Sequence, residues 1–207
     1  MSDSNPVSQA LGFANAIDER GELPYAARRQ LLGQLAQYLP DRNASVAFKG
    51  RLGLSCARRS WPVWQAAFPE ETRPMAAAES VVTQAIAGQP DTARGQELLG
   101  EVKADLDERL LLGEEFFTAV YAGFSCWAAA RDALAPEAPL PPAESELQLS
   151  PEEWDPCFFS SLALAGGATW DGQGDPRTRR AFWRWYLEEA VPDAVERARQ
   201  RRSQEPT

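Results

Sequence analysis

The sequence predicts an all-α protein, a single globular multi-helix domain of about nine helices with no sheet. Apolar residues recur at helical spacing through most of the chain, prolines and glycines separate these stretches, and no useful length alternates polar and apolar residues. With 207 residues, of which 44% are hydrophobic, the chain can bury a core without disulfides or metals. We expect one domain over residues 1–207.

Prolines delimit the helices expected in the first half of the chain. Pro24 suits the first turn of a helix whose leucines share one side, and Pro40 ends that helix. One helix is expected to reach Ser60, and the pair Trp61-Pro62 is expected to begin a short new one, because proline lacks the amide hydrogen and suits a first turn. The expected ranges are about 7–19, 24–39, 43–60, 61–68 and 74–87.

Caps and glycines delimit the helices of the second half. Asp91 or Thr92 caps a long helix that Gly113 closes, and the run from Ser150 to Glu153 is a typical capped start. Pro192 is expected to begin a separate basic tail helix. The expected ranges are about 91–112, 114–134, 150–165, 175–191 and a tail from 192. Residues 135–150, rich in proline and glutamate, form a long connection between helices.

Composition excludes several classes of chemistry. The chain has no histidine and only two lysines, Lys49 and Lys103, which removes Ser-His-Asp and Cys-His catalysis and most zinc sites. Carboxylate catalysis needs only Asp and Glu and stays a minor alternative. We therefore expect no enzyme activity, no cofactor and no metal. Three widely spaced cysteines, no targeting leader and no membrane-length apolar run predict a cytoplasmic protein with reduced thiols.

Charge is concentrated in the middle of the chain. Residues 61–175 carry 20 acidic and 5 basic side chains, whereas residues 1–60 and 176–207 each carry 8 basic and 5 acidic ones. This distribution argues against nucleic-acid binding and is compatible with a basic protein partner, since opposite fields accelerate association. The alternative is that the acidic side chains serve only solubility.

Two aromatic helices contain residues whose role the sequence leaves open. Arg131 falls among apolar residues, so it is either buried beside a carboxylate or extended to solvent at the helix end. Trp183 and Trp185 lie on opposite sides of their helix, so we expect one in the core and the other nearer the surface. Asp155 could belong to a carboxylate pair or cap a helix.

The C-terminal aromatic block is similar to a known family. It resembles the family numbered five among the immunity proteins of bacterial polymorphic toxin systems. The resemblance implies an all-helical cytoplasmic protein that binds and neutralises a cognate toxin, and it implies no catalytic residues. The matching residues are Trp154-Asp155, Phe158-Phe159, Ala163 to Gly167, Trp170, Arg179-Arg180, Phe182 to Leu187 and Glu189 to Pro192, with a weaker likeness around Arg58 to Trp61 and from Trp64 to Pro74.

One acidic flank is a candidate toxin-binding surface. It consists of Glu97, Glu101, Asp105 and Glu108, which share one side of the helix expected over 91–112. Like charges four residues apart destabilise a helix by roughly 0.2–0.5 kcal/mol per pair, so the stripe suggests a surface that faces a basic toxin. The alternative for the flank is a solvated face paired by arginines elsewhere. The alternative for the whole protein is a helical adaptor or ligand-binding protein without catalysis, which a deep apolar pocket would favour.

Overall fold

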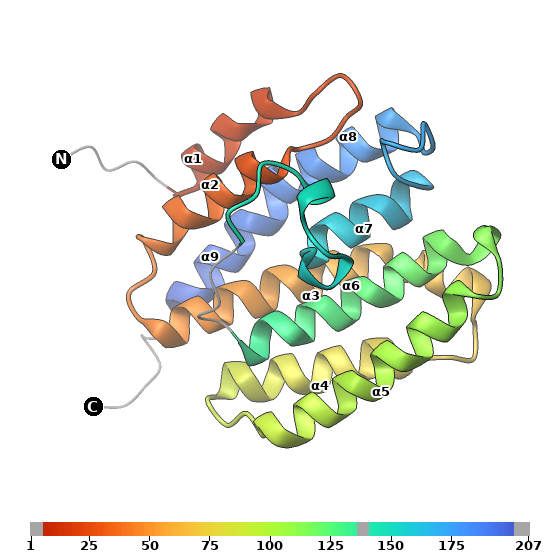
Figure 1. Ribbon diagram of the computed structural model, residues 1–207. Helices are drawn as coiled ribbons and strands as arrows, with labels where there is room; N and C mark the ends of the chain where they lie inside the picture. Colours follow the sequence, from red (N-terminus) through yellow and green to blue (C-terminus); the bar gives the residue numbers. More distant parts are fainter. Residues whose placement is uncertain (1–5, 136–140, 201–207) are drawn as a thin grey trace.

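The computed structural model describes residues 6–135 and 141–200, and every regular element among them is helical (Figure 1). The all-α prediction is confirmed. The α-helices are α1 Pro6–Gly12, α2 Tyr25–Ala36, α3 Arg42–Ala67, α4 Arg73–Ala87, α5 Thr92–Leu110, α6 Phe117–Leu134, α7 Pro156–Ala165, α8 Pro176–Trp185 and α9 Val191–Gln200. Short 3-10 turns are η1 Phe13–Ala16, η2 Glu114–Phe116, η3 Glu146–Gln148 and η4 Pro151–Glu153, and η5 Tyr186–Ala190 is a π-helical turn.

Helices α3 and α6 form the centre of the molecule. Small residues let them approach closely: a Cβ added to Gly53 of α3 would lie 3.1 Å from the Cβ of Ala129 in α6. Helices α4 and α5 cover one side of this pair, and α7, α8, α9, α1 and α2 cover the other (Figure 1). Two apolar clusters fill the two interfaces, one built around Trp64, Leu106 and Phe124 and the other around Leu31, Phe158 and Trp183.

Helix α3 continues through Pro62, contrary to the expected start of a new helix at Trp61-Pro62. Pro62 is exposed, so its ring points to solvent and not into the core. Trp64, two residues later, is fully buried and donates from its indole nitrogen to the carbonyl of Glu71. Burial of this tryptophan holds the last turns in line and offsets the backbone hydrogen bond that proline cannot make.

The C-terminal helix also continues past its proline. The sequence predicts a new helix at Pro192, whereas α8, the π-helical turn η5 and α9 follow one another without a break. A π turn is wider than an α turn, which leaves room for the Pro192 ring against the preceding turn. Within α8, Trp183 has no exposed surface, while Trp185 is half-buried under the guanidinium of Arg59 at 4.5 Å. Trp183 is therefore the core tryptophan of the pair.

The connection between α6 and α7 is packed against the fold where the structure describes it. The connection predicted over 135–150 lies partly outside the described residues, at 136–140. From Pro141 onward it carries two buried side chains, Ala143 and Glu146. The capped start predicted at Ser150 is a 3-10 turn closed by a capping box with Glu153, and α7 begins later, where Asp155 accepts from the Phe158 amide at 2.6 Å.

Candidate functional site

The predicted acidic flank lies on the outer side of α5. Asp91 caps the helix by accepting from the Arg94 amide at 3.0 Å, and Leu99, Val102 and Leu106 form its buried face. Glu97, Glu101 and Glu108 are exposed and Asp105 is half-buried, so the four side chains share an accessible strip as the sequence predicts.

Three of the four flank carboxylates have arginine partners within the chain. Glu97 pairs with Arg94 at 2.5 Å, Glu101 with Arg73 of α4, and Asp105 with Arg109 at 2.9 Å. Among the described residues, Glu108 has no ion pair. These pairs relieve the repulsion along α5 and reduce the local charge of the strip, which is what the solvated-face alternative anticipates.

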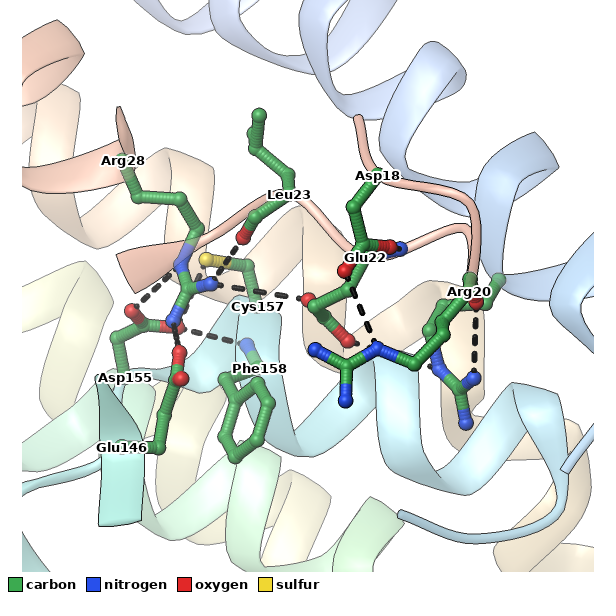
Figure 2. Close-up of polar contacts among 10 residues, drawn as sticks. Asp18, Arg20, Glu22, Leu23, Arg28, Glu146, Asp155, Cys157 and Phe158 are labelled. Atoms are coloured by element: carbon green, nitrogen blue, oxygen red, sulfur yellow. Dashed lines mark hydrogen bonds and ion pairs between the residues drawn. The ribbon is translucent and has the colours of Figure 1, made fainter. Parts of the chain in front are cut away.

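A second group of charges, missed by the sequence analysis, is buried on the opposite side of α3. Its centre is Arg28 of α2, whose side chain is only 1% exposed. Its Nε donates to Asp155 at 3.1 Å, one Nη donates to Glu146, and the other donates to the carbonyl of Leu23 at 2.5 Å (Figure 2). Burial opposes the charge of Arg28, but Asp155 and Glu146 together raise the pKa of Arg28 well above its usual value.

Aromatic rings surround the Arg28 guanidinium. Its central carbon lies 4.9 Å from the ring of Trp183, 5.3 Å from Phe158 and 5.6 Å from Tyr25. These faces are partially negative and replace part of the lost hydration. Arg28 therefore connects the residues that precede α2, the α6–α7 connection, α7 and α8.

Glu22 extends this group to a second buried arginine. Its carboxylate oxygens lie 3.7 Å from Arg28 and 3.5 Å from Arg179, which is also only 1% exposed. Neither oxygen of Glu22 has a hydrogen-bond partner among the described residues. Burial raises the pKa of Glu22 from 4.5 to about 8, with the two arginines opposing the rise and Glu146 and Asp155 adding to it. Three carboxylates share two guanidinium groups, so one retained proton makes the group neutral.

The contacts of this buried group hold separate parts of the chain together. Arg28, Arg179, Glu146 and Asp155 are all less than 10% exposed. Asp155 is further committed to α7, where it accepts from the Phe158 amide and from the Cys157 thiol at 2.8 Å. Asp155 is thus both a helix cap and an ion-pair partner.

A pocket of about 570 Å³ opens between α2, α3 and the segment before α7. The buried residues that line the pocket are mostly apolar. Tyr186 is one of them, and its hydroxyl has no hydrogen-bond partner among the described residues. The pocket volume is in the range of small-molecule sites. The buried lining residues are Leu52, Gly53, Cys56, Asp155, Pro156, Cys157 and Tyr186.

Arg131 lines this pocket. Its position is intermediate between the two that the sequence allowed, burial beside a carboxylate and extension to solvent at the helix end. Its guanidinium binds Asp132 at 2.6 Å, the carbonyl of Glu152 and the carbonyl of Trp154 at 3.0 Å, and it remains 26% exposed. It therefore has the expected carboxylate partner without full burial. The sequence did contain a signal for the burial of Arg28. Tyr25, Arg28, Leu31 and Leu35 recur at helical spacing, which places Arg28 on the apolar face of its helix.

The family model for immunity protein Imm5 matches residues 15–193, which include the whole buried charge group and α5. The chain belongs to the Imm5 family. This agrees with the resemblance carried by the C-terminal aromatic block, and it extends the match far upstream of that block. A search of curated proteins finds no match to the chain.

Two further observations apply to the described part of this Imm5 chain. None of its helices is long and apolar enough to span a membrane. Within residues 6–135 and 141–200, no group of three or more Cys, Asp or Glu side chains has the arrangement of a metal site.

The raised pKa of Glu22 gives a pH prediction. Between about pH 4.5 and pH 8 the folded protein retains a proton on Glu22 that the unfolded chain releases. The contribution of Glu22 to the free energy of unfolding therefore falls as the pH rises through this window. We expect wild type to lose stability between pH 5.5 and pH 8 relative to Glu22→Gln, which mimics the protonated carboxyl. Urea unfolding at several pH values measures this, and parallel profiles for the two proteins would contradict it.

Proposed function

We propose that this Imm5 protein binds and neutralises a cognate toxin, protects the cell that produces that toxin, and acts in the cytoplasm without catalysis. The observation that carries the proposal is the match of the Imm5 model across residues 15–193. An acidic chain without histidine, with net charge −9, suits an inhibitor that works by stoichiometric association. The partner is a protein, the toxin domain, and we propose that its contact surface is basic.

We further propose that Glu97, Glu101, Asp105 and Glu108 contribute to toxin binding. These side chains lie on an accessible strip of α5, and two of their three arginine partners are exposed, with side-chain exposures of 63% for Arg94 and 45% for Arg73. Arg109, the partner of Asp105, is only 20% exposed. Exposed pairs of this kind are weak and exchange partners at little cost. A basic toxin surface can therefore compete for the carboxylates.

Neutralising the flank tests this role. We expect the variant Glu97→Gln, Glu101→Gln, Asp105→Asn, Glu108→Gln to remain folded, with a change in unfolding free energy below about 1 kcal/mol. Its association with the toxin should be slower and less dependent on salt, because the long-range attraction is reduced. The measurement is surface-based kinetics at two ionic strengths. Its ligand is the neighbouring toxin domain, meaning the toxin-like C-terminal domain of a large protein that we expect a reading frame beside this gene to encode.

The matched control removes four exposed carboxylates elsewhere: Glu144→Gln, Glu188→Gln, Glu189→Gln, Asp193→Asn. It changes the net charge by the same amount. If both variants associate at equal rates, only the total charge matters and the flank has no special role. If wild type itself fails to bind the neighbouring toxin domain, the proposed function is wrong.

The pocket of about 570 Å³ favours a second candidate function, that of a ligand-binding protein without catalysis. Under this alternative, native mass spectrometry of the purified protein should detect a retained small molecule. Gly33 lines the pocket, and a Cβ added there meets nothing within 4 Å, so Gly33→Leu places a larger side chain at the pocket wall with room for its Cβ. If wild type carries a bound small molecule and Gly33→Leu does not, the result supports the alternative. If the mass of wild type equals that of the polypeptide alone, the result contradicts it.

A further inference from the structure

The turn after α5 exposes two adjacent leucines. Leu111 is 86% exposed and Leu112 is 55% exposed, which places both among the most exposed large apolar side chains of the described residues. We call residues 111–115 the tip. Single exposed leucines are common on soluble proteins, but two neighbours at the end of a helix form an apolar projection.

Backbone hydrogen bonds and a glycine determine the conformation of the tip. The amides of Leu111 and Leu112 donate to the carbonyls of Glu108 and Arg109 at 3.0 and 3.1 Å, which closes the last turn of α5. Gly113 follows with φ of 138°, a conformation that side chains rarely adopt, and a Cβ there would lie 2.5 Å from a carboxylate oxygen of Glu115. The glycine reverses the chain sharply into η2. The two leucines are therefore held outside the core.

Carboxylates precede and follow the leucines along the chain, and one more lies across a small pocket from Glu114 and Glu115. Glu108, Glu114 and Glu115 belong to the same turn, and Asp171 comes from the α7–α8 loop, which lies at the same end of the molecule (Figure 1). All are exposed, and none has an ion pair with another described residue. Glu114, Glu115 and Asp171 line a pocket of about 230 Å³ whose described lining residues include no lysine or arginine. This contrasts with the upstream flank, where arginines pair with the carboxylates.

We propose that the tip is the anchor by which this protein docks on a cationic surface of its toxin. The proposal rests on the proposed function and adds to it the location of the contact. An apolar centre within a charged rim is the usual anatomy of a protein interface, and the small acidic pocket suits one basic side chain of the partner. The flank leads along α5 to this point, and Glu108, at the end of the flank, lies next to the tip along the chain.

The charge of the tip disfavours two other occupants. A second copy of the chain would bring like carboxylates together, which is unfavourable at an interface. An anionic membrane surface would repel the same carboxylates. A toxin surface with lysines or arginines around an apolar depression would bury the two leucines and pair with the carboxylates near them.

The test compares dissociation rates from the neighbouring toxin domain. We expect Leu111→Ser, Leu112→Ser to dissociate roughly tenfold faster or more, because anchor residues act mainly on the dissociation rate. The control is Leu11→Ser, Leu147→Ser, which removes two leucines that are 44% and 68% exposed elsewhere, and it should dissociate within about twofold of wild type. Thermal unfolding confirms that both variants remain folded.

A second arm separates the rim from the anchor. Glu114→Gln, Glu115→Gln should slow association and reduce its salt dependence, with a smaller effect on dissociation. If the tip leucine variant dissociates like the control while wild type binds tightly, this inference fails and the proposed function stands. If wild type does not bind the toxin domain, the proposed function fails first. Concentration-dependent dimerisation of wild type that the leucine variant abolishes would overturn the choice of partner.

Discussion

The buried charge of Arg28 is the constraint on which the C-terminal half of this fold depends. A guanidinium group that is removed from water must be surrounded by acceptors, because an unpaired buried charge costs several kcal/mol. Arg28 obtains its acceptors from Leu23, Glu146 and Asp155, which lie in three separate parts of the chain. The chain before α2, the α6–α7 connection and the start of α7 must therefore meet at one place.

The same interaction links polar and apolar packing. Asp155 begins α7 as its cap and at the same time binds Arg28, so the position of the helix and the position of the charge are fixed together. Trp183 and Phe158 cover the guanidinium and also belong to the apolar cluster between α2, α7 and α8. On the other side of α3, the core is almost entirely apolar, and the charged residues of α5 remain at the surface. Charged residues are thus part of the interior on the side of α3 that holds Arg28, whereas on the side that holds α5 they lie at the surface.

The sequence is sufficient to predict the helical class, since periodic apolar residues and caps mark most helices. It is insufficient at Pro62 and Pro192, because whether a proline ends a helix depends on packing that is absent from local sequence: burial of Trp64 in one case and a π-helical turn in the other. That Glu97, Glu101, Asp105 and Glu108 share one side of α5 can be predicted from helical spacing alone. The flank's partner Arg73 comes from α4 and could not be predicted without the packing of α4 on α5. Glu146 and Asp155, which accept hydrogen bonds from Arg28, are over a hundred residues away from it, so local periodicity could suggest the burial of Arg28 but not these two partners.

The central claim, that paired burial of Arg28 organises this half of the molecule, is tested most directly by urea unfolding of Arg28→Met. Methionine retains the volume of the side chain but leaves Glu146 and Asp155 buried without their cation. The expected loss in unfolding free energy is about 3–5 kcal/mol. The control Arg58→Met removes an exposed arginine paired with Glu79 and should cost less than about 1 kcal/mol. Equal, small losses in the two variants would contradict the claim.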